Sequence, residues 1–171
     1  MMITEGECRL FTFKEGALSA LGHDLVLRAA RWSVDLRRES RTVTARVEAA
    51  SVAVVCARRH GADDPDALSS GDRAKIERTA RSEVLRVERF PEVVFEGRWE
   101  GDEPSVVGGT LALCGVTRPI EVRVSRSEGR LVCRATVHQP DWGITPYHAM
   151  LGALRVQADV QVEWTLAGSG A

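Results

Sequence analysis

The sequence of 171 residues lacks the features that mark several large classes of protein. No stretch approaches the roughly 20 consecutive apolar residues that a membrane-spanning helix needs. The opening stretch, MMITEGECRLFTFKEG, lacks the basic segment followed by an apolar segment that forms a signal peptide. We therefore expect a cytoplasmic protein with no membrane span.

Neither sign of charge is in excess. The 23 Lys and Arg residues nearly balance the 24 Asp and Glu residues, and both kinds are mixed along the chain. A nucleic-acid-binding protein carries a basic patch or stripe, so the sequence predicts no nucleic-acid partner. With 44% apolar and 27% charged residues, the chain fits one soluble globular domain over residues 1–171.

Motifs of metal binding and catalysis are also missing. The four cysteines, Cys8, Cys56, Cys114 and Cys133, form no C-x-x-C pair, so the spacing does not predict a zinc site. Because the cytoplasm is reducing, we expect free thiols that pack as small apolar groups. No Ser-His-Asp order, phosphate-binding loop or paired-carboxylate spacing stands out, which predicts no catalytic residue, metal or cofactor.

Most of the chain alternates apolar and polar residues with period two, the pattern of half-buried β-strands. The alternation predicts eight strands, over residues 8–14, 24–37, 42–54, 93–99, 106–115, 120–125, 131–138 and 156–166. Within 24–37 the apolar phase switches near Ala30 and Arg31, which predicts a bulge or a bend. The segment GVTRP (115–119) is interpreted as a break, with Gly115 and Pro119 as turn residues and Arg118 either in solvent or paired locally.

Two helices are expected between the strands. Apolar residues at Ile76, Ala80, Val84 and Val87 form a narrow stripe, which predicts a helix over about 72–88 that starts at Asp72 and covers part of the sheet. Residues 58–72 before it are rich in Gly, Asp, Ser and Pro, which predicts a loop with His60 in solvent. Thr145 followed by Pro146 predicts a short helix over about 146–154.

This order of elements predicts an all-β fold. Eight antiparallel strands with one apolar face can close into a lipocalin-like barrel that holds side chains or one ligand. Many of the residues expected to point inward are small, which favours a cavity over a solid core. They are Ala45, Ala49, Gly97, Gly109, Cys133, Ala135 and Ala158.

Several segments, taken in their order, resemble the YceI-like family of lipocalin-like, polyisoprenoid-binding proteins. They are GHDLVL, RVERFPEVVFEG, GGTLALCGVTRPIEV and LGALRVQADVQVEW, and the resemblance covers the chain from about Leu10 to Trp164. It implies an eight-stranded barrel that holds a long apolar chain, such as an isoprenoid or isoprenoid quinone. Cys114 stands where the family commonly has histidine, and family members are often periplasmic.

His23 and Asp24 are adjacent, at the start of a predicted strand. Neighbouring strand residues point to opposite faces, so a base held by a carboxylate is disfavoured. Two other interpretations remain open: a plain strand start after Gly22, or a place at the rim of a ligand pocket.

Other polar candidates lie around PDWGITPYH. His138, Asp141 and His148 with His23 would offer metal ligands, but nothing in their spacing requires a metal. Because ligand cavities are mostly apolar with a few polar anchors, aromatic residues are the natural candidates for a lining. The residues expected at a ligand are His23, Asp24, Phe13, Phe95, Trp99, His138, Trp142 and Tyr147.

The leading hypothesis is a non-catalytic carrier or store of an apolar lipid, with its polar head near His or Asp side chains at the barrel mouth. The alternatives are an enzyme that uses His23, His138 or His148, and a packed barrel that binds a protein partner. An open strand edge would also allow two barrels to pair as a homodimer.

Overall fold

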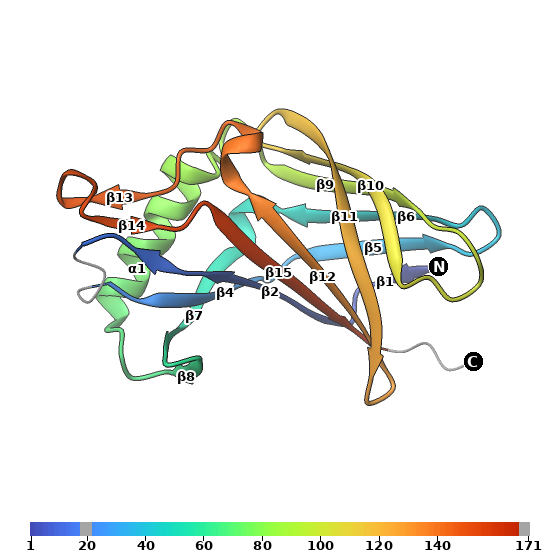
Figure 1. Cartoon of the computed structure of the whole chain (residues 1–171), viewed down its shortest axis with the longest axis horizontal. Coiled ribbons are helices and arrows are strands. Elements are labelled where there is room, and N and C mark those ends of the chain that lie inside the picture. Colours follow the sequence, from blue (N-terminus) through green and yellow to red (C-terminus); the bar gives the residue numbers. More distant parts are fainter. Residues whose placement is uncertain (18–21, 168–171) are drawn as a thin grey trace.

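The protein folds as a strongly curled antiparallel sheet with one main helix against it (Figure 1). The computed structural model describes residues 1–17 and 22–167. The sheet has twelve strands in the order β1-β5-β6-β9-β10-β11-β12-β15-β2-β4-β7-β8, and a small second sheet has the order β13-β14-β3. All described pairings are antiparallel, so the expected all-β class is confirmed.

The strands are β1 (Met2–Ile3), β2 (Gly6–Thr12), β3 (Lys14–Glu15), β4 (Asp24–Ala29), β5 (Trp32–Arg37), β6 (Thr42–Glu48), β7 (Val52–Arg59), β8 (Ala62–Asp64), β9 (Glu92–Arg98), β10 (Val106–Leu113), β11 (Val116–Ser127), β12 (Arg130–His138), β13 (His148–Ala149), β14 (Leu154–Val156) and β15 (Asp159–Leu166). The predicted count of eight strands was wrong. Two of the predicted runs, 24–37 and 42–54, are each divided by a bend, and the short strands β1 and β8 extend the two edges of the sheet.

A bent hairpin joins the two ends of this sheet. β5 pairs with β6, and beyond the bend β4 pairs with β7, so one double strand serves both halves. The bend falls at Ala30 and Arg31 on one strand, where the phase switch predicted it, and at the 3₁₀ turn η2 (Ala49–Ser51) on the other. Because β6 also pairs with β9 and β4 with β2, the hairpin draws distant parts of the ladder together into a barrel-like form.

The buried hydroxyl of Ser51 holds this corner. Its Oγ accepts a hydrogen bond from the backbone N of Arg31 at 3.0 Å and donates one to the carbonyl O of Glu48 at 2.7 Å. The Ala30 N–H donates to the Ser51 carbonyl, and the Glu48 N–H donates to the Arg31 carbonyl, so the backbone ladder continues through the bend. The outer side of the corner carries a two-point ion pair between Arg31 and Glu48.

The main helix starts earlier and ends earlier than predicted. α1 (Ser70–Thr79) begins after Ser69, whose hydroxyl accepts from the Asp72 backbone N at 3.1 Å, so Asp72 is the third helical residue of a capping box and not the cap. The helix continues as one π-helical turn, η3 (Ala80–Val84), and ends before Arg86, which has a positive φ of 50°. Ile76 and Val84, from the predicted stripe, pack against the core.

The predicted helix over 146–154 was wrong. After the 3₁₀ turn η4 (Gln139–Trp142), this part of the chain forms β13, the turn η5 (Met150–Gly152) and β14. Leu151 and Gly152 have positive φ values of 56° and 87°, which suit a tight turn and not a helix. β14 pairs with β3, so the backbone groups of this segment form their hydrogen bonds within a sheet and not within a helix.

The segment GVTRP was wrongly interpreted as a break. β11 runs without interruption from Val116 to Ser127, and Pro119 is paired with Thr110 of β10 inside it. The turn between β10 and β11 consists of Cys114 and Gly115, both with positive φ (50° and 79°), as in the two-residue turns that suit twisted hairpins. Glu128 and Gly129 repeat this geometry between β11 and β12.

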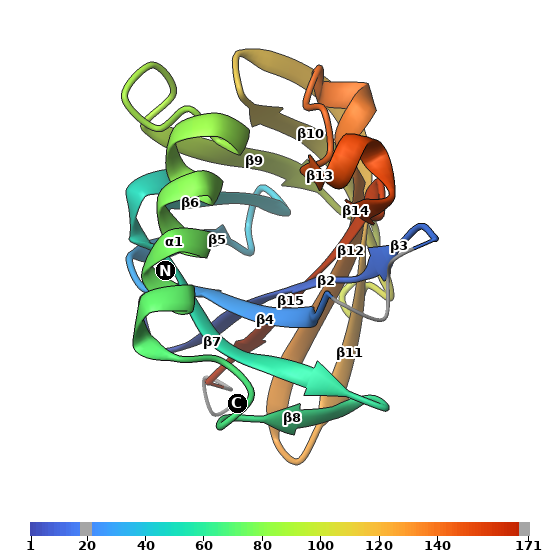
Figure 2. The same cartoon turned by 90° about the vertical axis from the view of Figure 1, so that its left-hand side faces the viewer.

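Two buried clusters fill the end of the curled sheet that α1 covers. One centres on Leu27 and Val54, the other on Leu111 and Trp142, and Leu85 beyond the helix packs against both. Figure 2 shows α1, β13 and β14 in front, at this end of the molecule. The four cysteines are free, as predicted, and three of them are buried. None of the helices in the described ranges is both long and apolar enough to cross a bilayer.

The corner at Ser51 gives a test of how the sheet is held together. Replacing Ser51 with Ala removes the acceptor for the Arg31 N–H and the donor to the Glu48 carbonyl. We expect the free energy of unfolding to fall by about 1–2 kcal/mol, measured by chemical denaturation. Ser82→Ala is the matched control, because the exposed Ser82 hydroxyl only donates to the Arg78 carbonyl within its own helix. Equal losses in the two variants would contradict this role for Ser51.

Candidate ligand-binding cavity

An apolar cavity of about 810 Å³ lies inside the curled sheet. Its wall comes mainly from the inward-facing residues of β2, β6, β9, β10, β11, β12 and β15. Aliphatic side chains dominate the lining and include Val43, Val47, Val122, Val124, Leu131 and Val160. This volume and this chemistry match those of cavities that hold small apolar ligands.

Side chains of the barrel interior remain only half-buried. Val43, Val122 and Val160 point inward, yet each keeps an intermediate exposure because it faces the cavity. The predicted small inward residues account for part of this space, since Ala45, Ala49, Cys133 and Ala135 all line the cavity. Ala158 does not: it lies in the interruption between β14 and β15.

Phe95 is seated over two glycines on the cavity wall. Gly97 of β9 and Gly109 of β10 are direct partners across the two strands. A Cβ atom on Gly97 would lie 2.6 Å from Cζ of Phe95, and one on Gly109 would lie 2.8 Å from its Cε2. The ring therefore lies flat against a patch of bare backbone, which a side chain at either glycine would occupy.

Two tryptophans add aromatic surface to the cavity. Trp164 on β15 and Trp99, just after β9, line it. Trp32 supports Trp164 from the side, with the ring centroids 4.8 Å apart in an edge-to-face arrangement. Both lining tryptophans would report on an occupied cavity through their fluorescence.

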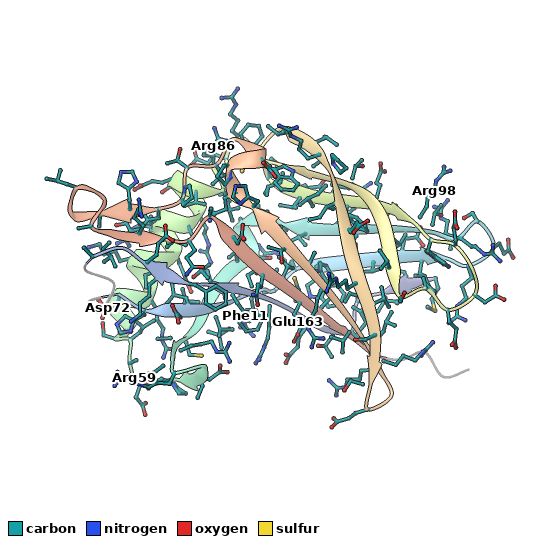
Figure 3. The ribbon with its side chains drawn as sticks, viewed as in Figure 1. Phe11, Arg59, Asp72, Arg86, Arg98 and Glu163 are labelled. Atoms are coloured by element: carbon teal, nitrogen blue, oxygen red, sulfur yellow. The ribbon has the colours of Figure 1, made fainter. Side chains whose placement is uncertain are left out.

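The mouth of the cavity carries charged residues. The turn between β5 and β6 contributes Arg38 and Arg41, the loop after β9 contributes Asp102 and Glu103, and β11 contributes Arg126. Arg41 Nη2 lies 3.1 Å from Asp102 Oδ1, so one ion pair links the two loops. In Figure 3, Arg98 at the end of β9 lies at this end of the molecule, and Asp72 of α1 lies at the opposite end.

The other end of the cavity is closed by Ala80, Val84, Leu85 and Ile144. Two polar side chains face the interior there. The amide of buried Gln139 donates from Nε2 to the Gln157 carbonyl at 3.1 Å. The hydroxyl of Thr12 is buried and lacks a hydrogen-bond partner within the described residues.

Of the residues expected at a ligand, Phe95 and Trp99 line the cavity. Phe13 is half-buried and lies outside the lining, like the others. Trp142 belongs to the second core cluster, where its Nε1 donates to the Leu111 carbonyl at 2.9 Å. Tyr147 remains 40% exposed beyond the closed end.

The polar candidates lie outside the cavity lining. His23 is exposed, and Asp24 begins β4 and accepts from the Lys14 backbone N at 2.8 Å through Oδ1. His138 lies on the outer face of β12, with Nδ1 2.6 Å from Asp159 Oδ1. Across residues 1–17 and 22–167, no three His, Cys, Asp or Glu side chains gather in a way that suits a metal ion.

The charged mouth was missed at the level of sequence. Four of its five charged residues lie in the segments RRESR and GDEP, which look like ordinary solvated turns, and the fifth, Arg126, lies near the end of β11. Because α1 covers one end of the sheet, the opening lies at the other end, and the sequence does not reveal which loops surround it. The mouth therefore carries three arginines, Asp102 and Glu103, whereas His23, Asp24 and His138 lie outside the cavity lining.

Cys114 has a structural role in the turn between β10 and β11. Its thiol is buried and donates to the Leu85 carbonyl, with Sγ 3.4 Å from the oxygen. This contact links the β10–β11 turn to the end of η3. Burial raises the pKa of the thiol, which keeps the sulfur protonated as a donor.

A sequence model of the YceI-like domain matches residues 14–167, which is nearly the whole described chain. The chain belongs to the YceI-like family. Its fold is similar to a polyisoprenoid binding domain from Saccharophagus degradans, with a TM-score of 0.61 and 13% identity over 96% of this chain and 93% of that one. It is also similar to BcnA from Burkholderia cenocepacia, with a TM-score of 0.57 and 12% identity over 94% of both chains. No curated protein matches the sequence significantly.

The glycine patch under Phe95 predicts that adding a single Cβ atom there lowers the stability of the protein. In Gly109→Ala the new Cβ would lie 2.2 Å from the Glu96 carbonyl oxygen and against the Phe95 ring. We expect a loss of about 1–3 kcal/mol in the free energy of unfolding, measured by chemical denaturation. Gly108→Ala is the control, because a Cβ on the neighbouring Gly108 meets nothing within 4 Å. The interpretation fails if the two variants are equally stable.

The cavity wall also predicts a loss of stability at alkaline pH. Burial raises the pKa of the Cys8 thiol from 9.0 to about 12, so above pH 9 the unfolded chain releases a proton that the folded chain retains. The free energy of unfolding should therefore fall as the pH rises from 9 toward 12. In Cys8→Ala this contribution is absent, and the stability gap between wild type and variant should narrow by about 2 kcal/mol from pH 9 to pH 10.5. Denaturant unfolding at the two pH values measures the gap, and a constant gap would contradict the buried thiol.

Proposed function

We propose that the protein binds one long apolar chain, of the isoprenoid kind, inside the cavity and serves to carry or store it. The unfilled apolar interior is the observation that supports this function most directly. A cavity of about 810 Å³ lined by half-buried aliphatic and aromatic side chains leaves apolar surface that a hydrocarbon chain would cover. Each 100 Å² of apolar surface so covered contributes roughly 2.5 kcal/mol before the ordering cost of the chain is subtracted.

The membership in the YceI-like family and the printed name of one structural relative support the same ligand class. The relative from Saccharophagus degradans is a polyisoprenoid binding domain. Its identity to this chain is 13%, so the support concerns the shared fold, and the ligand of this protein is proposed from its own cavity.

The two alternative functions have less support. A barrel packed with its own side chains does not fit a cavity of about 810 Å³. An enzyme that uses His23, His138 or His148 would need them beside a bound substrate, whereas all three are exposed outside the cavity lining. A cytoplasmic location and a homodimer stay predictions.

Native purification followed by extraction with organic solvent and mass spectrometry tests the proposal. We expect an apolar chain to co-purify, or, if the protein is isolated empty, to be taken up when geranylgeraniol is offered in excess. Binding is then followed by quenching of the fluorescence of Trp99 and Trp164. A protein that neither retains a lipid nor takes up geranylgeraniol would contradict the proposal.

Filling the cavity with a larger side chain predicts a loss of binding without a loss of fold. Ala45 of β6 lines the cavity and is paired with Phe95 of β9, so Ala45→Phe places a second ring in the space the ligand needs. We expect geranylgeraniol affinity to fall by about tenfold or more in a fluorescence titration, or about 1.4 kcal/mol. Glu96→Phe is the matched control, because it adds the same ring to an exposed position on the next residue of β9. Equal affinity in the two variants would argue that the ligand lies elsewhere.

A further inference from the structure

The wall of the cavity is split between β11 and β12. Residues 123–127 of β11 pair with residues 130–134 of β12, and the pairing stops there. Beyond that point residues 116–122 pair with β10 alone, and residues 135–138 pair with β15 alone, within the described chain. Two strand edges therefore face each other across an unpaired segment of the wall.

The residues at the point of separation explain why the strands part. Arg123 and Arg134 are direct partners in the last pair of the ladder, and like charges opposite each other oppose pairing. Arg134 is held toward the other neighbour by an ion pair with Glu163 of β15, at 2.7 Å between Nε and Oε2. Pro119 further along β11 has no N–H, so it suits an edge strand and offers no donor to β12.

The split is bounded at its other end by η4. Arg118 of β11 donates from Nε to the Asp141 carbonyl at 3.1 Å, and Trp142 of the same turn donates to the Leu111 carbonyl of β10. These two contacts connect the turn after β12 to the β10–β11 hairpin. The unpaired segment is thus a window with a closed rim, formed by β11, η4, β12 and the Arg123–Arg134 pair.

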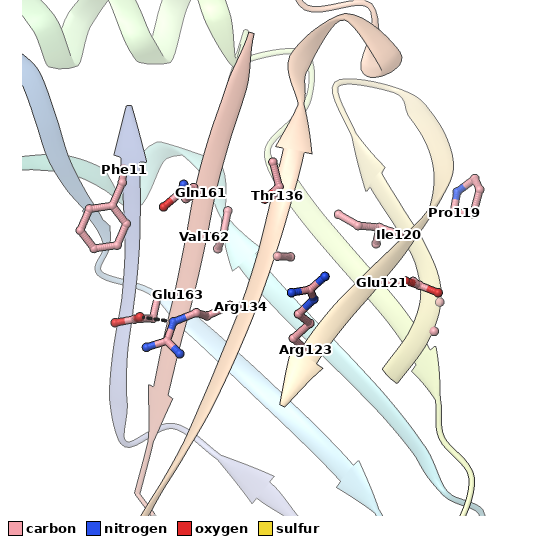
Figure 4. Close-up of a pocket in the computed structure, with 13 residues that line it drawn as sticks. Phe11, Pro119, Ile120, Glu121, Arg123, Arg134, Thr136, Gln161, Val162 and Glu163 are labelled. Carbon is pink, nitrogen blue, oxygen red and sulfur yellow. Dashed lines mark hydrogen bonds and ion pairs between the residues drawn. The ribbon is translucent and has the colours of Figure 1, made fainter. Parts of the chain in front are cut away.

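An outer groove lies over this window. Its polar rim includes Glu121, Arg123, Arg134, Thr136 and Gln161. Figure 4 shows Ile120 between the ribbons of β11 and β12, and Arg123 near the point where the two strands approach each other.

The groove and the interior cavity share part of their lining. Ile120, Ala135 and Val162 line both spaces, so these side chains lie between the outer groove and the interior cavity. Ala135 contributes only a methyl group to the β12 side. The Ile120 side chain has rotatable bonds, and no backbone ladder has to break for it to move aside.

We propose that the window between β11 and β12 is a lateral portal through which the apolar tail of the ligand enters and leaves the cavity. The portal rests on the proposed lipid binding. It adds a second route besides the charged mouth, and the side chains between the groove and the cavity on this route, Ile120, Ala135 and Val162, are apolar. A tail that passes sideways avoids Arg38, Arg41, Arg126, Asp102 and Glu103, which surround the mouth.

A reversible bridge across the window tests the portal. If the register of the ladder continued, Glu121 would stand opposite Thr136, and both are exposed on the rim. The double variant Glu121→Cys/Thr136→Cys is joined by a bifunctional thiosulfonate reagent and released again by a reducing agent. The native thiols compete poorly, because Cys8, Cys56 and Cys114 are buried and burial raises the pKa of Cys133 to about 11.

The measurement is the rate at which cis-parinaric acid, a fluorescent polyene fatty acid, enters and leaves the protein in stopped flow. We expect the bridge to slow both rates by about tenfold or more while the equilibrium affinity stays unchanged, and reduction to restore them. The matched control is Ser127→Cys/Arg130→Cys, which bridges the same two strands at a pair that is already joined and should leave both rates unchanged.

The outcomes separate the portal from lipid binding itself. Probe binding with rates that are the same before and after bridging would overturn the portal and leave the proposed function standing. Slowing by the control bridge to the same degree would also overturn it, because the effect would then come from stiffening of the strands. Failure of the unbridged protein to bind the probe or geranylgeraniol would overturn both proposals.

Discussion

The bend in the hairpin of β4–β5 and β6–β7 is the constraint on which the rest of the structure depends. An antiparallel sheet of this size has two ends, and this double strand belongs to both of them. Its β5–β6 half pairs with β9 near one end of the sheet, and its β4–β7 half pairs with β2 near the other. The corner at Ser51 sets the angle between the halves. The curled sheet then encloses an interior that the small side chains of its wall leave unfilled.

The strands and much of the cavity lining could be predicted because they depend on local alternation. Ala45, Phe95 and Ala135 each fall in the inward phase of a run whose other phase is polar, so their position follows from period two alone. The bend at Ala30 also left a local signal, the switch of phase. Family resemblance added the ligand class, which the alternation by itself does not specify.

The failures concern features that depend on contacts between distant segments. Thr145 and Pro146 carry a helix-start signal, but β14 meets its hydrogen bonds on β3, more than a hundred residues earlier in the chain. Pro119 was interpreted as a break because proline is rare inside sheets, whereas it marks the edge of a strand that lacks a neighbour there. His23 and His138 were associated with the mouth because sequence does not reveal which end α1 covers.

The ladder between β2 and β15 has a consequence for how the protein folds. It pairs Leu10 with Val162, residues about 150 positions apart. The entropy lost on closing this long loop is larger than the entropy lost in each of three tight hairpins, whose turns consist of one non-glycine residue followed by a glycine. Those hairpins can form while the chain is still incomplete, but the N-terminal strand must wait for the last one. The interior space is therefore enclosed only once the first and last long strands have paired, and a lipid has no enclosed site to occupy before that.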